Sequence, residues 1–180
     1  MSLIGIRIPV ETARLLREID VPGEKEDTAQ LHITLLDLGD EIDIQTVARA
    51  VVATYSVAQA ASPFWVKLGC VSCFPVRDPD VPNPIIAPII SPILQKMHSS
   101  LKREMNKAKV NFNKKFKEYR PHITLAYNDG EIKRTKIQPI ELIIQEIILW
   151  GGADGDNRMF CTFPLEIRKN EDIDCIRKIG

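Results

Sequence analysis

The tetrapeptide His-Ile-Thr-Leu occurs twice in this chain of 180 residues, at His32–Leu35 and again at His122–Leu125. The chain has three histidines in all, and two of them begin this tetrapeptide. At average residue frequencies, such a coincidence has odds on the order of one in a few thousand. Since the second copy begins half a chain length after the first, the repeat predicts two related lobes rather than a short-period solenoid.

The spacing within each copy fits a β-strand that is buried on one side. Side chains alternate along a strand, so His32 and Thr34 share one face while Ile33 lies on the other. The second copy repeats this arrangement with His122 and Thr124. Residues two apart stand roughly 6.6 Å apart along a strand, which lets an imidazole and a hydroxyl contact one small anion. We therefore expect the apolar faces to pack inward and both His/Thr faces to line one cleft.

Two such pairs suit phosphodiester displacement, in which an entering oxygen and a leaving oxygen lie on opposite sides of phosphorus. One neutral imidazole accepts a proton from the attacking water or hydroxyl, and the other, as imidazolium, protonates the leaving oxygen. The unperturbed histidine pKa of about 6.5 makes both forms accessible at neutral pH. The threonine hydroxyls donate to the non-bridging oxygens. The pattern predicts catalysis by His32 and His122 and phosphate binding by Thr34 and Thr124, without cofactor or metal.

The composition is that of a soluble globular protein, with 44% hydrophobic residues, 27% charged residues and a net charge of zero. No apolar run approaches the roughly 20 residues that span a bilayer, and the start does not resemble a signal peptide. A cytoplasmic protein with free thiols and no membrane partner is expected. Cys70 and Cys73 form a single CxxC, and Cys161 and Cys175 supply no second pair, so a zinc site is not expected.

Hydrophobic periodicity and turn residues predict an α+β fold. A late hairpin indicates antiparallel pairing. Residues 75–92 contain six of the twelve prolines, so we expect an extended loop or irregular hairpin there, and no central strand. Residues 169–180 are expected to form a tail. Helices are predicted at 12–19, 43–60 (capped by Asp43) and 91–109 (capped by Ser91), and strands at 3–10, 31–38, 64–74, 121–127, within 137–150 and at 158–167.

Other residues are candidates for supporting roles. His98 shares a predicted helix face with Leu94 and Leu101, which favours a partly buried structural histidine. Residues 101–120 hold eight Lys/Arg against two Glu. This run favours a polyanionic substrate, although a solvated helix face has the same composition. We expect possible substrate contacts beside the second motif and in the predicted strand 64–74, from Arg120, Tyr119, Tyr127 and Trp65.

The paired His-hydrophobic-Thr-hydrophobic motif resembles the two-histidine (2H) phosphoesterase superfamily, which includes 2′-5′ RNA ligase-like proteins and RNA cyclic phosphodiesterases. The resemblance covers about residues 3–167. It implies one domain over residues 1–180 with two pseudo-symmetric lobes. It also implies two antiparallel sheets related by a pseudo-two-fold axis, helices on the outside and a central cleft. Implied substrates are 2′,3′-cyclic phosphates, 2′-5′ linkages, and cyclic or linear oligonucleotide signals.

Two features depart from that family. Many members carry Arg or Lys after the small residue of the second motif, where this chain has Tyr127, which brings no positive charge. The proline-rich segment 75–92 has no clear counterpart, and we expect it to border the cleft and shape substrate choice. The chain is expected to bind RNA or a nucleotide, with no obligate protein partner. Three roles remain open: RNA end processing, degradation of oligonucleotide signals such as antiviral ones, and binding without turnover.

Overall fold

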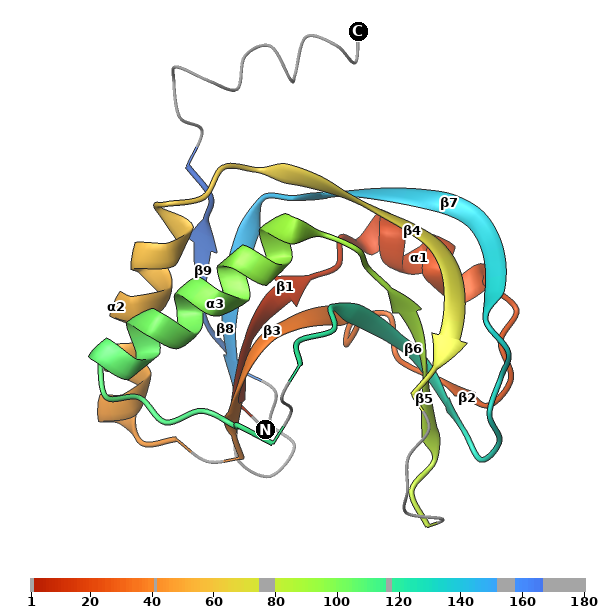
Figure 1. Cartoon of the computed structure of the whole chain (residues 1–180), viewed down its shortest axis with the longest axis horizontal. Helices are drawn as coiled ribbons and strands as arrows, with labels where there is room; N and C mark the ends of the chain where they lie inside the picture. Colours follow the sequence, from red (N-terminus) through yellow and green to blue (C-terminus); the bar gives the residue numbers. More distant parts are fainter. Residues whose placement is uncertain (1, 41, 75–79, 116–117, 152–157, 167–180) are drawn as a thin grey trace, which may run out of the picture.

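The computed structural model describes residues 2–40, 42–74, 80–115, 118–151 and 158–166. Strands and helices alternate through most of the chain, and all strand pairs are antiparallel, so the predicted α+β fold is confirmed (Figure 1). No helix in these segments is both long and apolar enough to cross a membrane. The elements are β1 (Ser2–Arg7), α1 (Val10–Glu18), β2 (Glu24–Lys25), β3 (His32–Gly39), α2 (Ile44–Ala58), β4 (Phe64–Cys73), β5 (Asn83–Pro88), α3 (Pro92–Lys107), β6 (His122–Asn128), β7 (Thr135–Ile144), β8 (Glu146–Gly151) and β9 (Arg158–Pro164).

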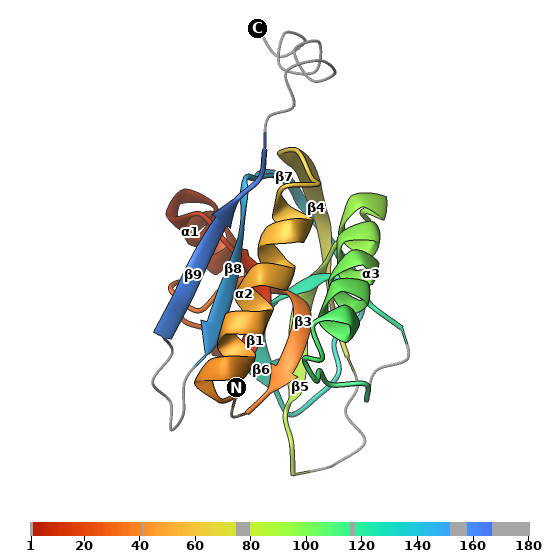
Figure 2. The same ribbon diagram turned by 90° about the vertical axis from the view of Figure 1, so that its left-hand side faces the viewer.

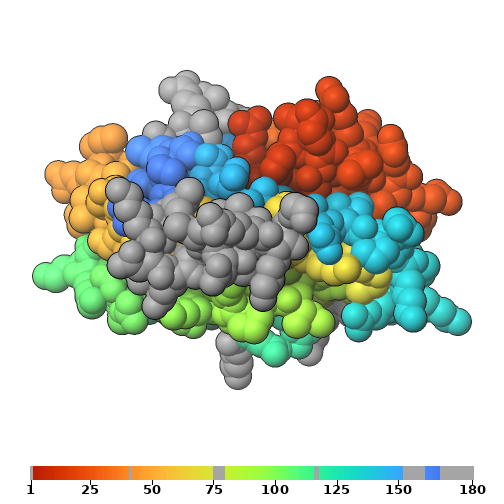
Figure 3. All heavy atoms as spheres, turned by 90° about the horizontal axis from the view of Figure 1, so that it is seen from above, coloured from red at the N-terminus to blue at the C-terminus, as the bar shows by residue number. Residues whose placement is uncertain are grey.

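The strand order shows the two lobes that the repeat predicts. The hydrogen-bonded path runs β7-β4-β5-β6-β3-β1-β8-β9, and the short strand β2 pairs with β6. The β6–β3 contact divides this path into two halves of four strands, in which β1 and β5 occupy equivalent places beside β3 and β6. Helix α1 follows β1 and α3 follows β5, and the two helices lie on opposite sides of the molecule (Figure 3). The two predicted sheets are thus joined edge to edge through the two motif strands.

The same irregularity occurs in both motif strands. A register shift in the β1–β3 pair leaves Leu35 without a directly opposed residue, and a shift in the β5–β6 pair does the same for Leu125. Such a β-bulge interrupts the alternation of side chains. As a result, two consecutive residues after each threonine enter the core, namely Leu35 and Leu36 in β3 and Leu125 and Ala126 in β6. The repeat in sequence is therefore also a repeat in local strand geometry.

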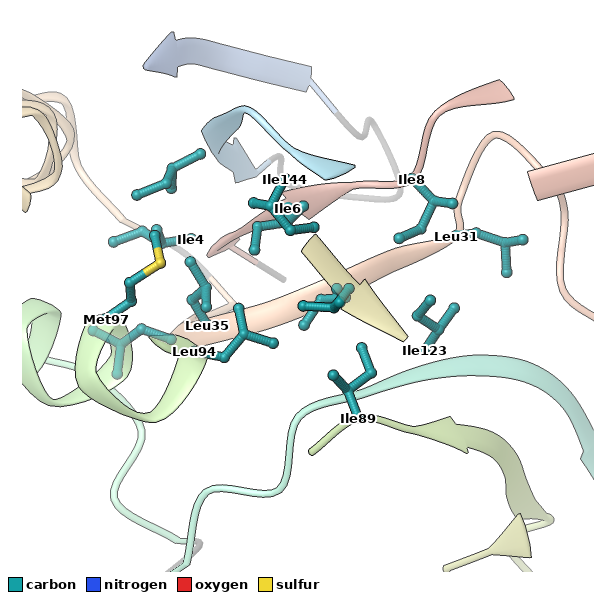
Figure 4. Packing of buried hydrophobic residues seen from close by; sticks show 14 of the residues in the cluster. Ile4, Ile6, Ile8, Leu31, Leu35, Ile89, Leu94, Met97, Ile123 and Ile144 are labelled. Atoms are coloured by element: carbon teal, nitrogen blue, oxygen red, sulfur yellow. The ribbon is translucent and has the colours of Figure 1, made fainter. Parts of the chain in front are cut away.

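Helices α2 and α3 begin where their capping residues predict. The Asp43 carboxylate accepts a hydrogen bond from the Thr46 amide, and the Ser91 hydroxyl accepts one from the Leu94 amide. Helix α2 packs on β8 and β9, while α3 packs on α2 and β3 (Figure 2). The buried face of the motif strands meets these helices and β1 in one apolar core, whose members include Ile4, Ile6, Leu35, Leu94, Met97 and Ile123 (Figure 4).

The proline-rich segment holds a central strand, so the expectation that residues 75–92 contain none was wrong. Strand β5 lies between β4 and β6. Its prolines, Pro84 and Pro88, sit next to the start and at the end of the strand, where a missing N–H removes little of the ladder. Strand β4 pairs only with Ile85 and Ile86, between the two prolines. Residues 75–79 lie outside the described residues.

The apolar run 137–150 forms two strands, where the sequence predicted one. Strand β7 pairs with β4 in one half, and β8 pairs with β1 in the other half. Periodicity cannot detect this change of partner, because both strands are rich in β-branched residues and only Gln145 separates them. The predicted hairpin of β8 and β9 is confirmed. The residues that join β8 to β9 (152–157) and the expected tail at 169–180 lie outside the described residues.

A substitution at Gly5 tests how tightly β1 holds the first motif strand. A Cβ atom built at Gly5 would lie 2.7 Å from the carbonyl oxygen of Ile33 and 3.0 Å from a methyl carbon of Leu3. Since the carbonyl belongs to the backbone, β1 and β3 must shift apart. We expect Gly5→Ala to lower the free energy of unfolding by about 1–3 kcal/mol in urea titrations. Gly69→Ala is the control, because a Cβ there meets nothing within 4 Å; equal stability of the two variants would contradict this account.

Candidate active site

One residue pair joins the two halves of the sheet. Ile33 of β3 lies directly opposite Ile123 of β6. In the described part of the chain, this pair defines the register between the two strands. Both side chains are fully buried, at 0% exposure. Because side chains alternate along each strand and both isoleucines lie on the core side, the residues before and after them point to the opposite side of the sheet.

This register brings the four predicted site residues together on one face. In an antiparallel pair centred on the two isoleucines, His32 lies across from Thr124, and His122 lies across from Thr34. Diagonal neighbours such as the two histidines are about 7–8 Å apart in a regular pair. All four side chains are partly exposed. Two imidazoles and two hydroxyls therefore face the same side of the sheet.

A backbone carbonyl fixes the orientation of each imidazole. The Nδ1 atom of His32 lies 2.6 Å from the carbonyl oxygen of Gln30, and the Nδ1 atom of His122 lies 2.6 Å from that of Arg120. A carbonyl oxygen can only accept, so each Nδ1 carries the hydrogen and donates it. In the neutral ring the unprotonated nitrogen is then Nε2, at the other side of the imidazole. The chain thus sets the same tautomer in both motifs.

Each histidine also meets the edge or face of an aromatic ring. Trp150 of β8 lies 5.6 Å from His32 between ring centroids, at an interplanar angle of 68°. Phe74, directly after β4, lies 4.8 Å from His122 at 87°. Both arrangements are edge-to-face, which is a favoured geometry for aromatic pairs. β8 and β4 hold equivalent places in the two halves, so the aromatic supports follow the pseudo-symmetry. The sequence contains no pattern that identifies either ring in advance.

The surroundings of the second motif histidine disfavour its charged form. Burial lowers the pKa of His122 below its ordinary value of 6.5, and the nearby His32 lowers it further. The hydrogen bond to the Arg120 carbonyl opposes these effects, because it stabilises the protonated ring. The net direction is downward, which favours a neutral His122 with a free lone pair on Nε2 at neutral pH.

Two of the four predicted substrate contacts lie in or just before β6 but differ in their surroundings, namely Tyr127 and Arg120. Tyr127 of β6 is 41% exposed, and burial together with Glu26 raises its pKa, so the phenol keeps its proton as a hydrogen-bond donor. The Arg120 guanidinium forms an ion pair with Glu118 at 2.6 Å. The backbone carbonyl of Arg120 orients His122, so this residue serves the site through its main chain.

The other two expected contacts are corrected by the structure. The Tyr119 hydroxyl donates to the Thr34 carbonyl at 3.1 Å, and burial raises the pKa of this phenol. Its ring stacks on His98 at 4.2 Å, and His98 in turn holds the Leu35 carbonyl through Nδ1 at 2.7 Å. Tyr119 therefore supports β3, and the structural role predicted for His98 is confirmed. Trp65 lies at the far end of β4, about 26 Å along the strand from Cys73 at the end nearest the site.

The described residues contain no group of three or more His, Cys, Asp or Glu side chains that could hold a metal ion. The two cysteines of the CxxC sequence contact different partners: Cys70 accepts a hydrogen bond from Arg134, and Cys73 interacts with the backbone of Ile132. A separate surface hollow lies between residues 19–22 and the approach to β7, and no predicted site residue lines it.

Comparisons with known proteins agree with this architecture. A family model described as the 2′-5′ RNA ligase superfamily matches residues 8–154. No curated protein sequence matches the chain. Among solved structures, TT0787 of Thermus thermophilus is 20% identical, with a TM-score of 0.74 over 92% of this chain and 98% of that one. Apo LigT of E. coli is 17% identical, with a TM-score of 0.64 over 92% and 97%. At these identities the structural likeness shows a shared fold.

The lowered pKa of His122 can be measured by NMR titration. The chain has three histidines, and the His122 signal is identified by its loss in His122→Asn. We expect its pKa to lie below 6.5, because burial and His32 disfavour the charged ring. In His32→Asn that pKa should rise, since a neighbour that can carry positive charge is removed. A wild-type pKa at or above 6.5, or no rise in the variant, would contradict the site electrostatics.

Proposed function

Because the chain belongs to the 2′-5′ RNA ligase superfamily, we propose that it is a metal-independent phosphodiesterase that acts on RNA-type linkages. The substrate class comprises 2′,3′-cyclic phosphates and 2′-5′ or 3′-5′ oligonucleotides. The observation that carries the proposal is the opposition of Ile33 and Ile123, which sets both His/Thr pairs on one face. LigT of E. coli was solved with 3′-AMP, and this neighbour supports a nucleotide as ligand here.

The reaction is an in-line displacement at phosphorus between the two motif strands. The Nε2 atom of one histidine accepts the proton of the attacking water as its oxygen bonds to phosphorus. The Nε2–H of the other donates its proton to the leaving oxygen as the second P–O bond breaks. The hydroxyls of Thr34 and Thr124 donate to the non-bridging oxygens, where charge is held in the transition state. Proton transfer from the first histidine to the second through solvent restores the starting state.

We assign the two roles from the surroundings of the histidines. His122 lies against Phe74, where desolvation favours the neutral ring, so it acts as the general base. His32, against Trp150, then acts as the general acid. Degradation of oligonucleotide signals and RNA end processing both use this chemistry. A binding module without turnover is disfavoured, because both histidines and both threonines are retained.

The proposal is tested with a screen of 2′,3′-cyclic nucleotides and 2′-5′ and 3′-5′ oligonucleotides. We expect His32→Ala and His122→Ala each to lower kcat by several orders of magnitude while folding is retained. Thr34→Ala and Thr124→Ala should each cost about 10²–10³, as for lost donors to a developing charge.

His98→Asn is the matched control for these variants. Its amide can still donate to the Leu35 carbonyl, so kcat should stay within about tenfold of wild type. Turnover should also persist in EDTA. Full activity of either motif-histidine variant, or complete loss of wild-type activity on chelation, would refute the two-histidine mechanism.

The assignment of acid and base predicts a dependence on the leaving group. A p-nitrophenolate leaving group needs little protonation, so a nucleoside p-nitrophenyl phosphodiester bypasses the general acid. We expect His32→Ala to lose less than about tenfold in kcat/KM on this ester and about 10³ or more on the matching alkyl ester. His122→Ala should lose equally on both esters. The opposite pattern would exchange the two roles.

A further inference from the structure

Arg7 lies beside the first motif histidine. Arg7 is the last residue of β1 and opposes His32 of β3 in the antiparallel register. Directly opposed residues project to the same side of a sheet, so the Arg7 guanidinium extends from the face that carries both His/Thr pairs. The next residues along this register, Ile6 and Ile33, are both buried on the core side, which is consistent with Arg7 pointing outward.

The charge of Arg7 is available to a ligand. The residue is exposed, and within the segments that the structure describes no carboxylate forms an ion pair with it. Arg120, which precedes the second motif, is instead neutralised by Glu118 at 2.6 Å. A guanidinium in the setting of Arg7 presents a planar set of donors that matches phosphate oxygens.

Among the described residues, the place equivalent to Arg7 in the opposite half carries no charge. The position equivalent to Arg7 is Pro88 of β5, which opposes His122. Across the sheet the order on the site face is therefore Arg7, His32, His122 and Pro88, from β1 through β3 and β6 to β5. In the proposed mechanism, the scissile phosphorus lies over the middle of this row, between β3 and β6. Arg7 lies at the β1 end of this row, one strand beyond His32. It can therefore contact the substrate on only one side of the phosphorus.

We infer that Arg7 is a specificity-determining residue that binds a second phosphate of the substrate, on the side of the leaving oxygen. The inference rests on the proposed function, in which His32 protonates that oxygen. In an oligonucleotide that ends in a 2′,3′-cyclic phosphate, the leaving oxygen and the 5′-phosphate belong to the same terminal nucleoside. Arg7 would therefore favour an oligonucleotide end over a mononucleoside cyclic phosphate. It would also supply positive charge to a site in which Tyr127 supplies none.

Two compounds that differ by one phosphate provide the test: adenosine 2′,3′-cyclic phosphate and the same compound with a 5′-phosphate. Wild type should prefer the 5′-phosphorylated compound in kcat/KM. Arg7→Gln should reduce that preference by roughly 10- to 100-fold, the range expected for a lost charge-assisted hydrogen bond. Arg7→Lys should keep part of it, because the charge remains but the paired donors are lost. Arg14→Gln, an exposed arginine of α1, removes the same charge elsewhere and should leave the preference unchanged.

Binding measurements separate a failure of this inference from a failure of the proposed function. Calorimetry with adenosine 2′-phosphate and adenosine 2′,5′-bisphosphate reports the preference for a second phosphate without turnover. If wild type turns over neither cyclic compound nor any 2′-5′ or 3′-5′ oligonucleotide of the screen, the proposed function fails, and the calorimetric preference and its loss in Arg7→Gln decide the inference. If wild type is active but Arg7→Gln keeps the same preference as Arg14→Gln, the role of Arg7 is refuted and the two-histidine mechanism stands.

Discussion

The opposition of Ile33 and Ile123 is the constraint on which the site depends. These two fully buried side chains fix the register between the halves of the sheet. The register in turn fixes the face of the sheet on which the residues before and after them lie. A slip by one residue would turn the histidine of that strand into the core. The apolar core therefore does more than stabilise the chain, because it sets two imidazoles and two hydroxyls on the same face of the sheet.

The two halves share their supports and differ in their surroundings. A β-bulge after each threonine, a carbonyl bonded to each Nδ1 and an aromatic ring against each imidazole occur in both. The differences make the two histidine ends of the site chemically distinct. Desolvation disfavours the cationic form of His122, and among the described residues an arginine lies directly opposite the motif histidine only in the other half, where Arg7 opposes His32. A pseudo-symmetric scaffold can thus serve the asymmetric reaction that we propose, in which one oxygen enters and another leaves.

Residues with a local signal were predictable, and residues defined by long-range pairing were not. The histidines and threonines stood out because strand alternation makes His-x-Thr a one-face pair, and Asp43 marked a helix start by its capping chemistry. The central strand β5 was missed because its prolines are tolerated next to its start and at its end, which the sequence alone does not show. Phe74, Trp150 and Arg7 became visible only when the register placed them beside the histidines.

A crystal structure with vanadate and a nucleoside tests the central claim most directly, because five-coordinate vanadium mimics the phosphorus of an in-line displacement. The account predicts a single vanadate centred between β3 and β6. The Nε2 atoms of His32 and His122 should each lie within hydrogen-bonding distance of opposite apical oxygens, with both threonine hydroxyls on equatorial oxygens. Vanadate bound to one histidine alone, or two anions bound separately at the two motifs, would contradict a shared phosphate site.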